Sequence, residues 1–283
     1  MGKGVSRLAA KVEKSAKNVL VPSVLFEEFG LRYYGPIDGH DLPLLIKTFE
    51  FLKEQKEPVI LHIITKKGHG YQPALDKPDK FHGLGKYKIE TGETDPSSVP
   101  TYSQIYGEYL TKFAKGDKKI TAITAAMPGG TGLTAFRDSE EVKDRYFDVG
   151  IAEEHAALFA SGLATQGLKP FLTIYSTFMQ RAFDMLVHDI GIQNLPVRLC
   201  MDRAGLSSDD GPTHHGLFDI GYLRHVPNFV FMQPKDEEEF VNMLWTMANY
   251  DSGPIAVRYP RGAGTGAKPQ DEPQELEIGK AEM

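Results

Sequence analysis

The chain has 283 residues, enough for more than one domain, and its 41% hydrophobic and 25% charged residues are typical of a globular protein. A formal net charge of -6 gives no basic surface for nucleic acid, and no apolar run is long enough to cross a membrane. The single cysteine, Cys200, excludes an internal disulfide and is interpreted as a buried core thiol within LPVRLCM. We therefore expect a reducing, cytoplasmic compartment.

The amino-terminal stretch permits several interpretations. MGKGVS fits an N-acylation pattern. Five basic side chains recur along the same stretch and give it the character of a transit peptide: Lys3, Arg7, Lys11, Lys14 and Lys17. Both patterns are short and easily met by chance. We favour a surface helix, with an apolar stripe that begins at Val5 and ends at Val19.

A first block precedes a linker predicted at residues 90–100. Its pattern predicts a helix at residues 42–53 and a strand at residues 58–65. The following stretch, KKGHGYQPALDKPDKFHGLG, is rich in Gly, Pro and Lys and predicts a loop. Asp-Gly is turn chemistry, so Asp38 and Asp41 in PIDGHD are interpreted as structural.

Strands and helices alternate in the second block. Strands are predicted at residues 120–125, 145–149, 170–175, 196–202, 229–233 and 254–258. Helices are predicted at residues 153–166, 177–192 and 236–249. Such alternation, with several strands apolar nearly throughout, predicts an α/β fold with a parallel sheet and helices on both faces. The tail from Gly262 predicts a linker or a frayed end.

Four side chains fall at or just beyond the carboxyl ends of predicted strands: Glu153, Tyr175, Arg203 and Arg258. Parallel strands open these ends on one sheet edge, where ligands bind. For Glu153 alone, in RYFDVGIAEEHA, helix capping is the simpler interpretation, because an acidic residue in a first turn meets the helix dipole favourably. An arginine after a strand is usually a surface ion pair, but two at converging ends favour a phosphate site.

Seven motifs occur in one order along nearly the whole chain: YYGPIDGHD, HIITKKGHGYQPA, DKFHGLG, FDVGIAEEHA, IYSTFMQRAFD, DRAGLSSDDGPTHHG and AVRYPRG. Together they resemble the 1-deoxy-D-xylulose-5-phosphate synthase family, thiamine-diphosphate enzymes of the transketolase superfamily. The resemblance implies condensation of pyruvate with D-glyceraldehyde 3-phosphate to 1-deoxy-D-xylulose 5-phosphate and CO2, for isoprenoid, thiamine and pyridoxal synthesis. It also implies thiamine diphosphate and Mg²⁺ as cofactors, and a homodimer.

The resemblance implies roles for four cofactor residues. Glu153 matches the activating glutamate, which shares a proton with the aminopyrimidine ring of the cofactor. Phe178 resembles the aromatic that stacks on this ring, although core packing is the alternative from sequence alone. Tyr71 matches a cofactor contact, and Lys66 lies where an ammonium could face the diphosphate. Without the family, a glycine-flanked Lys-Lys pair is more often a solvated loop.

The resemblance also implies the acceptor's phosphate site. Tyr175, Arg203 and Arg258 look like its binders, and guanidinium groups suit this role as bidentate donors to phosphate oxygens.

Two histidines match active-site residues of the family. These are His82 and His214, accompanied by Arg181 and Asp210. An imidazole can transfer protons near neutral pH, although a satisfied structural role is the simpler interpretation for any single histidine. THHG offers a choice, and similarity to the family motif favours His214 over His215.

Parts of the family pattern do not occur in this chain. No upstream Gly-Asp-Gly motif is present to bind Mg²⁺, and no C-x-x-C or H-E-x-x-H spacing occurs, so no metal ligand is assigned. Residues 1–98 are interpreted as the end of a diphosphate-binding domain with its linker, and residues 99–262 as the pyrimidine-binding domain. Residues 263–283, ending in QELEIGKAEM, are interpreted as a linker and the first strand of a further domain.

The chain is therefore expected to be a fragment or one half of a split enzyme, and inactive alone. Two alternatives stay open. One is another transketolase-like enzyme or the β subunit of a 2-oxo acid dehydrogenase. The other is a non-catalytic partner subunit.

Overall fold

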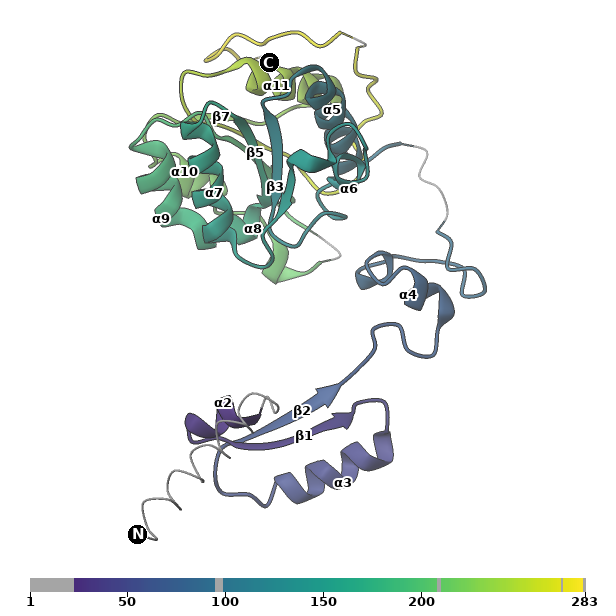
Figure 1. The fold of residues 1–283 in the computed structure, drawn as a ribbon. Helices are drawn as coiled ribbons and strands as arrows, with labels where there is room; N and C mark the ends of the chain where they lie inside the picture. Colours follow the sequence, from purple (N-terminus) through teal and green to yellow (C-terminus); the bar gives the residue numbers. More distant parts are fainter. Residues whose placement is uncertain (1–22, 95–98, 208–209, 271, 282–283) are drawn as a thin grey trace, which may run out of the picture. The chain divides into compact units, whose positions relative to one another are not determined.

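The structure is a computed structural model that describes residues 23–94, 99–207, 210–270 and 272–281. The chain divides into two compact units, one ending at Asp95 and the other beginning at Pro96, and each is described by itself (Figure 1). The amino-terminal surface helix that the sequence predicts lies outside the described residues. None of the described helices has the length and apolar character that a bilayer span requires.

The first unit is built around a parallel pair of strands. Its elements are α2 (Ser23–Glu28), β1 (Arg32–Asp38), α3 (Leu42–Leu52), β2 (Val59–Ile64), α4 (Gln72–Asp76) and the 3₁₀ turn η1 (Lys80–His82). The predictions of a helix at 42–53 and a strand at 58–65 are confirmed. Strand β1 was not predicted, because its internal Gly35-Pro36 pair has turn chemistry. The strand accommodates this pair with a shift of register between Tyr34 and Ile37.

Two aspartates shape the turn between β1 and α3. The Asp38 carboxylate accepts a hydrogen bond from the backbone N–H of His40 at 2.8 Å. Asp41 is the N-cap of α3 and accepts from the N–H of Leu44 at 3.0 Å, which satisfies one of the free donors of the first turn. The structural role predicted for both aspartates is confirmed.

The second unit is an α/β fold with a parallel six-stranded sheet in the order β4-β3-β5-β6-β8-β7. Its strands are β3 (Ile120–Thr124), β4 (Tyr146–Asp148), β5 (Lys169–Tyr175), β6 (Arg198–Asp202), β7 (Val230–Met232) and β8 (Ile255–Arg258). Its helices and helical turns are α5 (Tyr102–Gly116), α6 (Thr134–Arg137), η2 (Lys143–Arg145), α7 (Glu153–Thr165), α8 (Ser176–Met179), η3 (Gln180–Ala182), α9 (Phe183–Met185), η4 (Leu186–Gly191), η5 (Pro212–His214), α10 (Asp219–Leu223) and α11 (Glu237–Asn249). All six predicted strands are confirmed.

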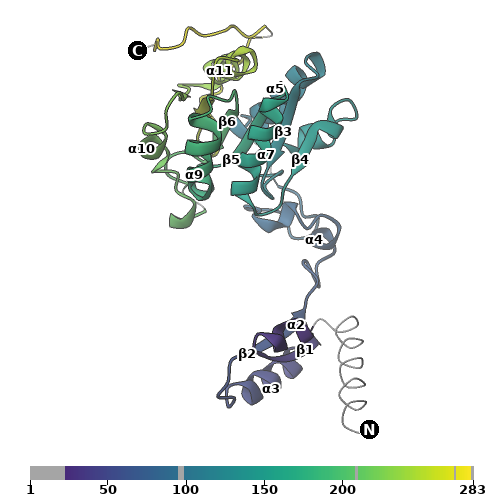
Figure 2. The ribbon, with the colours of Figure 1, turned by 60° about the vertical axis from the view of Figure 1, so that its left-hand side comes forward.

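Helices cover both faces of this sheet. Figures 1 and 2 show α5, α6 and α11 on one face and α7 to α10 on the other. Two apolar cores result, one containing Tyr106 and Phe240 and the other containing Ala156 and Leu186. Every residue of β3 and β6 is buried, including Arg198 and Asp202 at the two ends of β6.

Several helical segments differ from the prediction. The stretch after β2 that was predicted as a loop contains α4 and η1, and the short helices α6 and α10 were not predicted. The helix expected at 177–192 is divided into α8, η3, α9 and the π-helical η4. The sequence did not reveal this division, because short α-, 3₁₀- and π-helical stretches have nearly the same apolar pattern. Helix α5 was not predicted, although a capping box marks its start. Thr101 and Gln104 each accept a hydrogen bond from the other's backbone N–H.

The described part of the tail packs against α11 instead of fraying. Buried Glu237 accepts hydrogen bonds from the N–H and hydroxyl of Thr265 and from the N–H of Gly266. Farther along, Leu276 N–H donates to the Thr246 hydroxyl of α11. The strand expected in QELEIGKAEM is not found, because residues 272–281 form no strand. Instead, backbone N–H groups there donate to side chains of α11.

Candidate active site

The predicted strand-end residues lie on one edge of the sheet. Tyr175 ends β5, Arg203 follows β6, and Arg258 ends β8, while Glu153 begins α7 shortly after β4. All these strands are parallel, so their carboxyl ends share that edge. The chain passes from β4 across β3 to β5, and such a topological switch point is where open α/β sheets bind ligands.

Glu153 is a buried carboxylate with one partner of opposite charge. Its side chain is 3% exposed, and Arg181 Nη1 donates to Oε1 at 2.6 Å. Glu153 stands in the first turn of α7, where an acidic residue meets the helix dipole favourably. This interpretation applies beside the predicted active-site role. Burying a carboxylate is costly unless it is paired, and Arg181 provides the pairing.

Two aromatic rings and a second guanidinium group continue from Arg181 along the same edge. The Arg181 guanidinium lies over the Phe178 ring at 4.8 Å, and Phe178 stacks on Tyr175 with centroids 5.7 Å apart and planes 17° apart. The Arg203 guanidinium lies 3.8 Å from the centroid of Tyr175. Cation–π and stacking contacts thus connect the predicted cofactor side to the predicted phosphate side. Phe178 also packs against the α7 core, as the core-packing alternative predicts, while its stacking on the cofactor ring stays a prediction.

The two adjacent histidines have different environments. The His214 ring meets the edge of Phe178 with centroids 5.2 Å apart, and its Nδ1 lies 2.9 Å from the Thr213 hydroxyl. In contrast, His215 Nδ1 accepts a hydrogen bond from the backbone N–H of Ser207 at 3.0 Å, which is a structural contact. Of the two, His214 is therefore the one that contacts Phe178, and its active-site role stays a prediction.

Arg203 stands at the centre of a charged network. Its Nη1 donates to the Gly130 carbonyl at 2.7 Å and to Asp202 Oδ1 at 2.9 Å, while its Nε lies 3.5 Å from Asp210 Oδ2. Asp202 is fully buried and also accepts from the Ser103 hydroxyl at 2.6 Å. Burial raises the pKa of Asp202 to about 6, although Arg203 and Ser103 oppose the rise.

Arg258 does not have the geometry of a phosphate binder. Its guanidinium is buried, Nε donates to buried Asp219 at 2.8 Å, and the other nitrogens donate to Gln233 and to the Gly216 carbonyl. Three residues later, Arg261 lines the same cavity as Arg203 and lies 3.3 Å from Asp210. The sequence prediction missed Arg261, although AVRYPRG contains both arginines.

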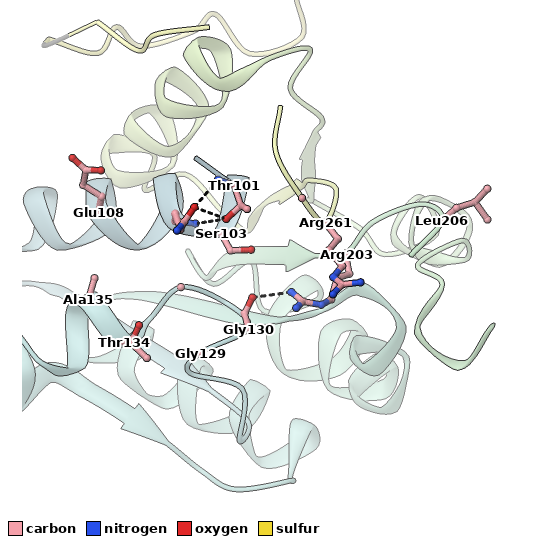
Figure 3. A pocket seen from close by; sticks show the side chains of 13 residues that line it. Thr101, Ser103, Glu108, Gly129, Gly130, Thr134, Ala135, Arg203, Leu206 and Arg261 are labelled. Atoms are coloured by element: carbon pink, nitrogen blue, oxygen red, sulfur yellow. Dashed lines mark hydrogen bonds between the residues drawn. The ribbon is translucent and has the colours of Figure 1, made fainter. Parts of the chain in front are cut away.

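The cavity beside Arg203 has a volume of about 730 Å³. Figure 3 shows Arg203 and Arg261 close together, with Gly130 bonded to Arg203. Residues of α5 and the loop after β3 complete the lining, and Glu108 lies away from the arginines. The lining residues are Thr101, Ser103, Gln104, Glu108, Gly129, Gly130, Gly132, Thr134, Ala135, Arg203, Leu206, Arg261 and Gly262. The sequence prediction did not include Ser103 or the loop that contains Gly129, Gly130 and Gly132.

The other predicted site residues belong to the first unit. Tyr71 is partly buried and donates its hydroxyl to the Ile89 carbonyl at 2.6 Å. Lys66 is exposed, and the Nδ1 of exposed His82 lies 2.9 Å from Lys67 Nζ. The predicted site residues of the second unit thus lie along one sheet edge. Tyr71, Lys66 and His82 are described within the first unit alone.

Two chemical properties limit what the described residues can bind or do. No group of three or more His, Cys, Asp or Glu side chains among them is arranged to hold a metal ion. Cys200 is buried, and burial raises the pKa of its thiol, which confirms a core thiol instead of a nucleophile.

Comparisons with known proteins identify similar sequences over the whole chain. Residues 98–265 match the transketolase pyrimidine-binding domain, and residues 1–65 match a domain described as 1-deoxy-D-xylulose-5-phosphate synthase. The chain is 58% identical to 1-deoxy-D-xylulose-5-phosphate synthase of Acidobacterium capsulatum and 56% identical to that of Methylacidiphilum infernorum. The matches cover 100% of this chain but 44% of each relative, so the chain spans less than half of their length.

Transketolases are among the solved structures with a similar fold. A split-gene transketolase, described as an inactive β4 tetramer, is 26% identical with a TM-score of 0.51, over 62% of this chain and 55% of that chain. A transketolase of Pichia stipitis is 18% identical with a TM-score of 0.51, over 66% of this chain and 29% of that chain, and shows the fold alone.

Proposed function

We propose that this chain, which belongs to the transketolase pyrimidine-binding family, is the pyrimidine-side part of a 1-deoxy-D-xylulose-5-phosphate synthase. The whole enzyme condenses pyruvate with D-glyceraldehyde 3-phosphate to 1-deoxy-D-xylulose 5-phosphate and CO2. It does so with thiamine diphosphate and Mg²⁺, as a cytoplasmic homodimer. The observation that carries this proposal is the buried Glu153 at the sheet's switch point, beside the stacked rings of Tyr175 and Phe178.

The residues present fit the aminopyrimidine half of thiamine diphosphate. A flat heteroaromatic ring needs an aromatic face and a hydrogen-bonding partner for its ring nitrogen, and Phe178 and Glu153 offer these on one edge. When bound, the cofactor supplies a thiazolium carbon that becomes a nucleophile. Glu153 would hold the proton shared with the ring, and Arg181 would supply the countercharge that its buried carboxylate needs.

The charged end of the cavity suits the acceptor's phosphate. Arg203 and Arg261 are two guanidinium groups near one carboxylate, Asp210, and Nε of Arg203 is buried without a hydrogen-bond partner in the structure. Such an unmatched donor fits a phosphate oxygen. Tyr175 would support Arg203 from below with its ring, and His214 would exchange protons with the substrate near Phe178.

The residues of the first unit complete the proposal. Tyr71 and Lys66 would contact the cofactor, with the Lys66 ammonium toward the diphosphate, and His82 would join His214 in proton transfer. The ligands for Mg²⁺ are expected in a protein segment that precedes the matched region in the relatives.

A second candidate function is a subunit that is inactive alone. It is supported by the likeness to the split-gene transketolase described as an inactive tetramer, and by a match that spans 44% of each curated relative. In this candidate, the chain contributes Glu153 and the phosphate arginines to a site that another chain completes.

Complementation tests the proposed function. The chain is incubated with pyruvate, glyceraldehyde 3-phosphate, thiamine diphosphate and Mg²⁺, alone and with the remaining segments of the Acidobacterium capsulatum relative added. We expect product only in the complemented mixture, and none with Glu153→Ala. A complemented mixture that forms other two-carbon transfer products would favour another transketolase-like enzyme. A mixture that stays inactive although the segments associate would favour a non-catalytic subunit.

Proton exchange at the thiazolium carbon tests Glu153 itself. In the complemented enzyme, Glu153→Ala should slow this exchange, followed by NMR, while the second unit stays folded. An unchanged exchange rate would remove Glu153 from cofactor activation.

A further inference from the structure

The donors of Arg203 are unequally used. Nη1 donates two hydrogen bonds, to the Gly130 carbonyl and to Asp202. Nε is buried and makes no hydrogen bond, with only the Asp210 carboxylate at 3.5 Å, and no hydrogen bond from Nη2 to any described residue occurs. Because Nε–H and one Nη2–H point the same way, this edge of the guanidinium is the one that can grip an oxyanion with two hydrogen bonds.

Contacts from different elements fix this orientation. The Tyr175 ring of β5 lies 3.8 Å from the guanidinium carbon, Gly130 comes from the loop after β3, and Asp202 is the last residue of β6. Asp202 is in turn tied to α5 by the Ser103 hydroxyl at 2.6 Å. The backbone of Arg203 has φ of +61°, a left-handed conformation that non-glycine residues adopt at a cost, so these contacts hold a strained position.

Gly130 leaves room beside Nη2 of Arg203. A Cβ at this position would lie 1.7 Å from the Tyr175 hydroxyl and 3.2 Å from Arg203 Nη2. Any side chain here would therefore displace the ring that supports Arg203 and crowd the nitrogen that remains available.

We propose that Asp202 is a positioning residue for the acceptor's phosphate: anchored by Ser103, it holds Arg203 by Nη1 so that the Nε–Nη2 edge meets the phosphate oxygens. The inference rests on the proposed function, because it assigns Arg203 to phosphate. It adds a side chain that is fully buried, touches no substrate and acts through Arg203 alone. The role requires a hydrogen-bond acceptor at position 202, but it does not require a negative charge there.

This distinction separates two substitutions of the same residue. Asparagine keeps an oxygen that can accept from Arg203 Nη1, and its amide can donate to the Ser103 hydroxyl, so Asp202→Asn should preserve the orientation. Alanine removes both contacts, so Asp202→Ala should leave the guanidinium free to turn toward Asp210. Ser103→Ala removes only the anchor and should give an intermediate effect.

The test measures binding of glycerol 3-phosphate to the 283-residue chain, with glycerol as the matched probe that lacks phosphate. Calorimetry gives the affinity. The ¹⁵N–¹H signal of arginine Nε groups, with the Arg203 signal identified by its loss in Arg203→Lys, reports whether the Nε edge is engaged. Urea unfolding followed by tryptophan fluorescence shows that each variant is folded.

We expect glycerol 3-phosphate to shift the Arg203 Nε signal of the wild-type chain, and glycerol to leave it unchanged. Asp202→Ala should weaken phosphate binding about tenfold or more and Asp202→Asn less than about threefold, as loss of one charge-assisted hydrogen bond implies. Equal binding by wild type and Asp202→Ala would overturn the positioning role while the phosphate site stands. A wild-type chain whose Arg203 signal does not respond to glycerol 3-phosphate would overturn the assignment of Arg203 to phosphate, and this inference with it.

Discussion

Replacing Asp202 by asparagine should stabilise the second unit at alkaline pH. The carboxyl is fully buried, and desolvation raises its pKa from 3.8 to about 6 even though Arg203 attracts its charge. In the unfolded chain the same carboxyl has its ordinary pKa. A pKa difference of about 2 between the two states corresponds to about 3 kcal/mol in the free energy of unfolding.

The direction follows from proton binding. Between about pH 4 and about pH 6 the folded chain binds the Asp202 proton more tightly than the unfolded chain, so stability falls as pH rises through this window. Above about pH 6 the loss is complete. Asparagine carries no charge and avoids the loss, so the advantage of Asp202→Asn should be about 3 kcal/mol at about pH 8, about half of that at about pH 5, and nearly absent below about pH 4.

Urea unfolding followed by tryptophan fluorescence measures this effect in the correct unit. Trp245 is the only tryptophan of the chain and packs against Phe113 with ring centroids 5.0 Å apart, within the second unit. Asp144→Asn, at an exposed aspartate of η2, is the matched control and should leave stability unchanged at all three pH values. If Asp202→Asn is no more stable than wild type at about pH 8, the attraction of Arg203 outweighs desolvation and the argument fails.

Three further changes test the packing around the site. Gly130→Ala should abolish glycerol 3-phosphate binding in calorimetry because its Cβ would clash with a ring, whereas Gly129→Ala, with open space at that position, should bind normally; equal binding by both would contradict the clash. Arg198→Met removes a buried guanidinium that donates to carbonyls at the end of α11, and should cost about 3 kcal/mol in urea unfolding; a loss below about 1 kcal/mol would make these bonds unimportant. Glu237→Ala releases the tail from α11 and should make limited proteolysis after residue 262 several times faster, so an unchanged cleavage rate would show that the tail is held by other contacts.

The alternation of strands and helices was readable from the sequence. Each predicted strand of the second unit, such as that at residues 170–175, lies within two residues of an observed one, because strand and helix periodicities are local properties of the chain. The position of Glu153 at a strand-to-helix junction was readable for the same reason. Because the strands were expected to pair in parallel, the side chains at their ends could be placed on one sheet edge before any of their contacts were known.

Tertiary structure alone decided which members of a motif face the cavity. Arg258 and Arg261 are three residues apart in AVRYPRG, and only the packing of α10, which brings Asp219 against Arg258, shows that Arg261 is the one beside Arg203. In the same way, only the packed structure shows that the backbone N–H of Ser207 donates to His215, while the ring of His214 contacts Phe178.

Asp202 shows the physical reason for this limit. From the sequence it is an acid at the end of a strand, and nothing local predicts that it is buried or bonded to Ser103, 99 residues earlier. Backbone conformation depends on neighbours in the chain, so sequence pattern predicts the elements and the edge they share. Desolvation and the choice of partner depend on elements that are distant in sequence, so the charge state and direction of each side chain are set only when those elements pack together.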